Sequence, residues 1–259
     1  MDALFGLFLL AVGASVGFLS GLLGIGGGIV MFPLLLYVPP LLGFHTVDVK
    51  SVTGLTMAQG FFSALAALFY YHKNALVNKQ LVLTLGLSLF LSSLIGALVS
   101  REIDDNILLM VFGALALIAA IMMLLPRTYV RDEMTEENVV FNKSLAVAIG
   151  VVLGFTIGLV GQGGAFILIP VMLYLLKIPL RVALGSTLAI GLFSSSAGLL
   201  GKVATGQVPY LLTLPLLAGA IPSARVGSIV GKRTRTVYLK WLLAALIAAT
   251  AIKVWISIL

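Results

Sequence analysis

Two runs of glycine are the residues of this sequence whose type and spacing could do chemistry. Gly26-Gly27-Gly28 and Gly163-Gly164-Ala165 each stand between two strongly apolar segments. Consecutive glycines interrupt a helix, and the first amides of the helix that follows have no partner inside it. A helix start also carries a partial positive charge of roughly half a unit, so free amides there bind anions. The two runs predict a pair of anion-binding helix starts, and the alternative is a plain hinge between a long and a short helix.

Polar side chains near these runs are further candidates for contact with an anion. The amide of Gln162 could donate to an oxyanion or satisfy a local carbonyl group. Lys50 and Arg181 begin equivalent segments, and each could bind the anion or extend to the lipid headgroups. Buried hydroxyl groups often bond only to carbonyls of their own helix, which weakens the case for threonine. Three more polar candidates lie inside apolar segments: Thr56, Gln59 and Thr187.

Arg225 is a cation inside an apolar segment. A charge in that position costs at least about 2.5 kcal/mol, so Arg225 is a functional candidate that could line a pathway or extend to the nearby basic loop. No Asp or Glu lies within the apolar segments, and Asp48 stands at a segment edge. A positively charged pathway without carboxylates suits an anion.

The elements that must position these residues are membrane-spanning helices. Of the 259 residues, 61% are hydrophobic and 10% are charged, which is more apolar surface than a soluble domain can bury. Apolar runs of roughly 20 residues recur, each long enough to cross a hydrocarbon core about 30 Å thick. The absence of cysteine excludes disulfides and thiolate metal sites. The net charge of +7 comes from short loops, which indicates membrane topology and no nucleic-acid partner.

The chain is an internal duplication. The stretch "GLLGIGGGIVMFPLLL" at 21–36 recurs as "GLVGQGGAFILIPVML" at 158–173. Small residues at every fourth position let helices approach closely in lipid, so two glycine stripes predict helix packing. The stripes align with each other and consist of Gly13, Gly17 and Gly21 in the first copy and Gly150, Gly154 and Gly158 in the second.

The predicted fold is all-α, with about ten membrane segments in two inverted five-segment repeats that contain broken helices. The first repeat is placed at 1–126, a polar cytoplasmic linker at 127–143 and the second repeat at 144–259. The expected segments are 3–24, 28–37, 49–71, 80–100 and 106–125, then 142–160, 164–176, 181–201, 209–230 and 237–258.

Charge placement predicts the orientation of these segments. If each is a crossing, the linker and most basic loops share one side, while Lys50, Arg101 and Lys202 lie on the other with both termini. The positive-inside rule then places the linker and basic loops in the cytoplasm and both termini outside. An odd number of crossings in each half makes the repeats inverted, which is a construction of secondary transporters with a midplane substrate site.

The two glycine boxes, "GFLSGLLGIGGGIVMFPLLL" and "GFTIGLVGQGGAFILIPVML", resemble the TauE/SafE family of membrane transporters, the sulfite exporter group. A K/R-S-x-T-G-like stretch after each box adds to the resemblance, which covers nearly the whole chain. It implies transport of small sulfur-containing anions such as sulfite and organosulfonates, with no bound cofactor. The second box ends in Ala165 instead of glycine, so the two half-sites differ.

These patterns predict a secondary transporter of the cell inner membrane that exports small anions by alternating access around a midplane site. A passive anion channel is the alternative, and a non-transporting membrane scaffold is the third hypothesis. HExxH is absent from the sequence and the apolar segments hold no paired carboxylates, so neither an enzyme nor a metal site is expected. Bulky residues at Gly27 and Gly164 are expected to abolish transport and leave the fold intact.

Overall fold

The computed structural model describes residues 3–24, 26–71, 77–125, 141–161 and 165–258, and all regular secondary structure in these ranges is helical. This confirms the helical class predicted from composition, with segment bounds close to those expected. The helices are α1 (Ala3–Leu23), α2 (Gly28–Leu41), α3 (Val49–Tyr71), α4 (Lys79–Val99), α5 (Asp105–Leu124), α6 (Lys143–Val160), α7 (Ala165–Tyr174), α8 (Leu180–Ala204), α9 (Tyr210–Arg233) and α10 (Thr236–Ile258).

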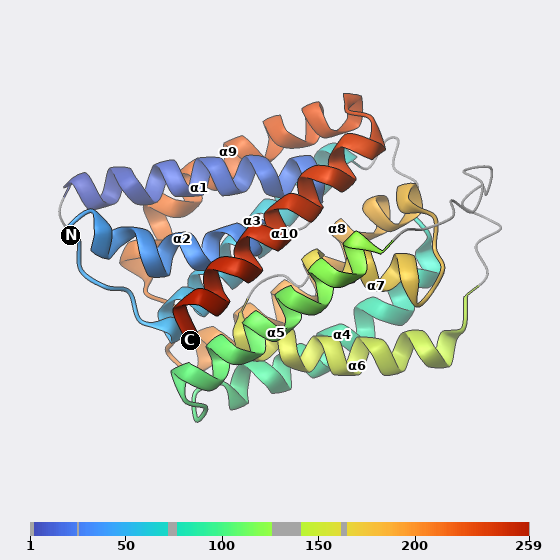
Figure 1. Ribbon diagram of the computed structural model, residues 1–259, viewed down its shortest axis with the longest axis horizontal. Coiled ribbons are helices and arrows are strands. Elements are labelled where there is room, and N and C mark those ends of the chain that lie inside the picture. Colours follow the sequence, from blue (N-terminus) through green and yellow to red (C-terminus); the bar gives the residue numbers. More distant parts are fainter. Residues whose placement is uncertain (1–2, 25, 72–76, 126–140, 162–164, 259) are drawn as a thin grey trace.

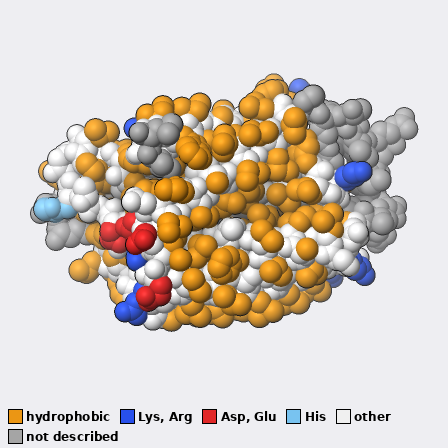
Figure 2. All heavy atoms as spheres, turned by 60° about the horizontal axis from the view of Figure 1, so that its bottom comes forward, with side chains coloured by type: hydrophobic (Ala, Val, Ile, Leu, Met, Phe, Trp, Pro, Cys, Tyr) orange, Lys and Arg blue, Asp and Glu red, His pale blue; other side chains and the backbone are white. Residues whose placement is uncertain are grey.

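Seven of the described helices are long and apolar enough to cross a membrane: α1, α4, α5, α6, α8, α9 and α10. Two others are too short to do so alone, because the 14 residues of α2 and the 10 of α7 reach about 21 Å and 15 Å at 1.5 Å per residue. Figure 2 shows hydrophobic side chains over the middle of one face and charged side chains toward its two ends. The protein is therefore a multi-pass membrane protein.

The long helices run roughly along one axis of the molecule (Figure 1). The beginning of α1 and the end of α10 lie at the same end of the bundle, together with the loop that joins α2 to α3. The end of α5 and the beginning of α6 lie at the opposite end. This arrangement brings helices of the two halves of the sequence side by side.

The glycine stripe of α1 packs against α9. A Cβ atom at Gly13 would fall on the Leu216 carbonyl group, and one at Gly21 would fall on the Ala224 carbonyl group. The backbones are so close that no larger residue fits at either position. The helix-packing interpretation of this stripe is confirmed.

The second stripe does the same for α6 and α4. A Cβ atom at Gly150 would meet Ser88 Oγ, and one at Gly158 would meet the Ser93 carbonyl group. Ser92 Oγ also donates to the Gly150 carbonyl across this interface, at 3.2 Å. Each glycine stripe therefore joins the first helix of one half to the fourth helix of the other half.

The two short helices lie against α5 through aromatic rings. Phe32 of α2 stacks on Phe112 of α5 with ring centroids 4.1 Å apart, and Phe166 of α7 meets the same ring edge-on at 6.0 Å. All three rings are buried. These contacts hold α2 and α7 in the interior. Each of the two helices begins at the last residue of a glycine run, Gly28 for α2 and Ala165 for α7.

Helix α2 differs from the expected segment in its length. It continues to Leu41 through Pro39 and Pro40, whereas an end at 37 was expected. Proline lacks a backbone N–H and usually ends a helix. Here both prolines lie in the last turn, so few helical hydrogen bonds are lost.

Candidate functional site

Helices α3 and α8 cross the interior and carry a row of polar side chains that do not reach solvent. Such groups are costly in a membrane interior unless they have partners or line a pathway. The buried polar residues of α3 are Thr53, Thr56, Gln59 and Ser63, and those of α8 include Ser186, Thr187, Ser194 and Ser195.

The first glycine run has the backbone conformation of a helix break. Gly24, Gly26 and Gly27 have φ of 71°, 71° and 72°, a left-handed region that other residues rarely adopt. Gly27 is the N-cap of α2 and provides no side chain to cap the first amides. Gly28, the first residue of α2, is buried. The start of α2 therefore lies uncapped by a side chain inside the protein, as an anion site of this kind requires.

The first break lies against both α3 and α8. A Cβ atom at Gly24 would be 3.3 Å from the Leu184 carbonyl oxygen, and one at Gly27 would be 3.3 Å from Gln59 Nε2. A cavity of about 10 Å³, roughly the space of one water molecule, lies between Gly26, Thr187 and their neighbours. The structure thus gathers four of the predicted site residues at one place: Gly26, Gly27, Gln59 and Thr187.

The second break is described only at its first glycine. Gly161 has φ of 71°, and a Cβ atom there would fall on the backbone and Cβ of Thr53 in α3. In the aligned copies Gly161 corresponds to Gly24, and Thr53 corresponds to Leu184. Each break therefore touches the third helix of the other half at an equivalent position. Three predicted site residues lie outside the described residues: Gln162, Gly163 and Gly164.

One expectation for the glycine runs is wrong. A Cβ atom at Gly27 would lie 2.6 Å from Val16 Cγ1 and 2.7 Å from the Val16 carbonyl oxygen. A bulky residue there would displace α1 and would not leave the fold intact.

The polar residues of the site differ in what they can offer an anion. Thr56 donates to the Thr53 carbonyl at 2.8 Å, and Thr187 donates to the Ala183 carbonyl, so both hydroxyl hydrogens are used within their own helices. Gln59 Nε2 donates to Ser63 Oγ at 2.9 Å, whereas Gln59 Oε1 has no hydrogen-bond partner among the described residues.

The predicted cations do not gather at the first break. Lys50 lies in the first turn of α3 and donates to the Arg101 carbonyl oxygen at 2.6 Å. Arg225 is exposed on α9, on a face that it shares with the exposed side chains of Ile221 and Val226. The side chain of Arg181 lies outside the described residues.

Lys202 is the functional candidate that the sequence reasoning missed. It was grouped with the loop charges, but α8 continues to Ala204 and encloses it. Lys202 is 0% exposed and is the one buried residue with a formal charge in the described part of the chain. The sequence does contain a signal for Lys202. When the two halves are aligned, Lys202 pairs with Tyr71, so the first half has no corresponding cation.

The apolar exterior, the long helices and the buried polar interior define a multi-pass helical membrane protein. The family model described as "Sulfite exporter TauE/SafE" matches residues 9–254. The chain belongs to the TauE/SafE family, which confirms the resemblance in the glycine boxes.

Curated relatives are named as transporters. The chain is 26% identical to the probable membrane transporter protein YunE of Bacillus subtilis, over 88% of this chain and 89% of the relative. It is 27% identical to a probable membrane transporter protein of Methanocaldococcus jannaschii, over 92% and 91%. It is 30% identical to one of Xylella fastidiosa, over 85% and 83%. No solved structure matches the chain. Together with the family match, these names indicate a membrane transporter.

Proposed function

We propose that this protein is a secondary transporter that exports small sulfur-containing anions, such as sulfite and organosulfonates, by alternating access. The anion binds near the midplane, between the helix starts that follow the two glycine breaks. The observation that carries this proposal is the pair of equivalent contacts, Gly24 with Leu184 and Gly161 with Thr53. Two breaks related in this way direct two helix starts toward the crossing of α3 and α8.

Matching helix contacts support an inverted repeat. Helix α1 packs on α9 as α6 packs on α4, and α3 packs on α9 as α8 packs on α4. The pairs α2–α3 and α7–α8 also correspond, while α3–α8 and α5–α10 join equivalent helices of the two halves. Rocking of one repeat against the other can then expose a shared site to either side of the membrane. In this topology the linker and basic loops are cytoplasmic.

The charge of the interior supports an anion as the substrate. None of the four carboxylates in the described part of the chain is buried: Asp48, Glu102, Asp104 and Asp105. Figure 2 shows red carboxylate side chains toward one end of the molecule, away from its apolar middle. A helix start and a buried ammonium group are both positive, and each favours a small anion in a medium of low dielectric.

The side chain of Gln59 supplies the donor that such an anion needs. Its Oε1 is buried without a hydrogen-bond partner among the described residues, and a 180° rotation of the amide group exchanges the positions of Oε1 and Nε2. Ser63 Oγ–H then donates to Oε1, and Nε2, now at the former position of Oε1, is free to donate to an anion there. The bound anion would stabilise this second orientation of the amide. Both Oε1 and Nε2 are then hydrogen-bonded, whereas Oε1 has no partner in the first orientation.

The small size of the cavity supports a carrier over a channel. A space of about 10 Å³ beside the first break admits no sulfite ion, so this conformation closes the site at that point. A carrier must pass through a closed state of this kind in each cycle. The membrane potential can drive export without a coupling ion, because an anion that leaves an inside-negative cell gains about 2.3 kcal/mol per charge per 100 mV.

Uptake into proteoliposomes tests this function. The purified protein is expected to take up labelled sulfite and labelled sulfonates with a rate that saturates, and unlabelled anion on the far side should accelerate the uptake. A rate that rises linearly with concentration and shows no such acceleration would indicate a channel. Absence of flux with every sulfur oxyanion would indicate a scaffold. Liposomes without protein are the control.

A further inference from the structure

We infer that Lys202 is the counter-charge of the transported anion: its buried ammonium group binds the anion between the cavity at one end of the bundle and the second glycine break. This inference rests on the proposed function and names a binding residue for it. Three observations carry it, namely the hydrogen bonds of the ammonium group, the position of Lys202 and the charges around it.

The ammonium group of Lys202 is held by neutral acceptors from three other parts of the chain. Nζ donates to Ser100 Oγ at 2.7 Å, to Gln207 Oε1 at 2.9 Å and to the Leu159 carbonyl oxygen at 3.1 Å. No carboxylate pairs with it in the described part of the chain. Burial of a charge is strongly unfavourable unless an opposite charge compensates it. The three acceptors satisfy the N–H groups but provide no opposite charge, and a bound anion would supply one.

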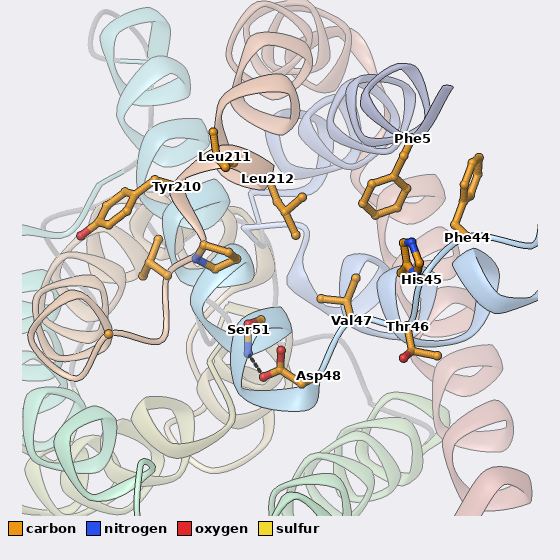
Figure 3. A pocket seen from close by; sticks show the side chains of 13 residues that line it. Phe5, Phe44, His45, Thr46, Val47, Asp48, Ser51, Tyr210, Leu211 and Leu212 are labelled. Carbon is orange, nitrogen blue, oxygen red and sulfur yellow. Dashed lines mark hydrogen bonds between the residues drawn. The ribbon is translucent and has the colours of Figure 1, made fainter. Parts of the chain in front are cut away.

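A cavity of about 790 Å³ is lined by the two chain neighbours of Gln207, the residue that accepts from Lys202. Figure 3 shows this cavity between Phe5 and His45 on one side and Tyr210 on the other, with Asp48 and Ser51 between them. Its lining includes Gly206 and Val208, the two neighbours of Gln207 in the chain. The Gln207 side chain turns inward from this wall to the ammonium group of Lys202. An anion in the cavity is therefore separated from the ammonium group by one amide side chain.

The other side of Lys202 leads to the second break. Leu159, whose carbonyl accepts from Lys202, lies two residues before Gly161. A Cβ atom at Gly54 of α3 would fall on the Gln207 carbonyl, and Gly161 packs on the adjacent Thr53. Lys202, the loop after α8 and the second break are thus linked to one another, and the loop and the break both pack on α3.

The surrounding charges make this region attractive to anions. Lys50 donates to the carbonyl oxygen of Arg101, the residue after Ser100, and so adds a second positive charge near Lys202. The carboxylate of Asp48 accepts from the Ser51 amide at 2.9 Å, so the start of α3 partly balances its negative charge. In the bound state, an oxygen of the sulfite or sulfonate group replaces Gln207 Oε1 as the acceptor for Nζ.

A purely structural role for Lys202 makes a different prediction, and Gln207→Glu separates the two. The variant has a similar shape and places a carboxylate at the 2.9 Å position of Oε1, which gives the ammonium group an internal counter-ion. It also loses the two hydrogen bonds that Gln207 Nε2 donates to Ser100 Oγ and Thr205 Oγ1. If Lys202 only holds α8 against α4 and α6, the ion pair with the new carboxylate maintains that contact and leaves the KM for the anion unchanged. If Lys202 binds the anion, the empty protein stays folded while KM increases by about tenfold or more.

The experiment measures sulfite and methanesulfonate uptake in proteoliposomes, and the rise in Tm that each anion causes in detergent, for wild type, Gln207→Glu and Lys202→Gln. Gln80→Glu is the matched control, because Gln80 is exposed in the first turn of α4. We expect Gln207→Glu to lose the anion-dependent rise in Tm and Gln80→Glu to keep it.

The outcomes separate this inference from the proposed function. Unchanged KM and an unchanged anion-dependent rise in Tm in Gln207→Glu would overturn the role of Lys202 and leave the transport function standing. Anion-dependent stabilisation that Gln207→Glu abolishes, in a wild type that shows no flux, would support the Lys202 site and overturn transport. If Lys202→Gln does not fold, Gln207→Glu alone decides the question.

Discussion

Gly161→Ala is expected to lower the free energy of unfolding by roughly 2–6 kcal/mol and to stop anion transport. The backbone at Gly161, with φ of 71° and ψ of −178°, lies in a region that essentially only glycine adopts, which costs alanine about 1–3 kcal/mol. The methyl group would also fall on Thr53, which adds about 1–3 kcal/mol of overpacking. Relief of that clash moves the second break away from α3, and the anion site depends on their contact. Thermal unfolding in detergent and uptake in proteoliposomes measure the two effects.

Gly43→Ala is the matched control for Gly161→Ala. Gly43 has φ of 77°, but a Cβ atom there would have no neighbour within 4 Å. This variant carries the backbone strain alone, about 1 kcal/mol, and should transport normally. Equal stability and equal transport in the two variants would show that the close approach of Gly161 to α3 has no role.

Gln59→Glu is expected to reduce anion transport by on the order of a hundredfold. Its carboxylate would lie beside Gly27, where a Cβ atom would be 3.3 Å from Nε2 of the native side chain. Two like charges about 5 Å apart repel by about 3 kcal/mol at an effective dielectric constant of 20, which corresponds to that factor. Initial rates of sulfonate uptake, corrected for the amount of folded protein, measure the effect.

Gln59→Met separates the charge from the loss of the amide. Methionine has a similar length and no charge, so it removes the donor without adding repulsion, and transport should fall less than in Gln59→Glu. Wild-type rates in Gln59→Glu would place the anion pathway elsewhere in the protein.

The elements of the fold could be predicted from the sequence because lipid imposes simple rules on it. Apolar runs marked the long helices, and the four-residue spacing of Gly13 and Gly17 marked the face that packs on α9. Both signals depend only on short stretches of sequence and apply to membrane helices in general. The end of α2 was missed because prolines in a last turn interrupt few hydrogen bonds, which their presence in the sequence does not reveal.

The gathering of the candidate site was only partly predictable. Duplication indicated that the two glycine breaks were related, but not that each would touch the third helix of the other half. Lys202 was missed for a similar reason. Its acceptors Ser100, Leu159 and Gln207 come from three separate parts of the chain, so their meeting is a property of the packed helices alone.

Distribution of a sulfonate across the membrane at a fixed potential tests the central claim most directly. In proteoliposomes held at 100 mV, a singly charged sulfonate carried without a coupling ion should accumulate on the positive side, up to about fiftyfold at equilibrium, because each charge gains about 2.3 kcal/mol. Reversal of the potential should reverse the gradient. A sulfonate distribution that ignores the sign of the potential would contradict uncoupled anion transport by this protein.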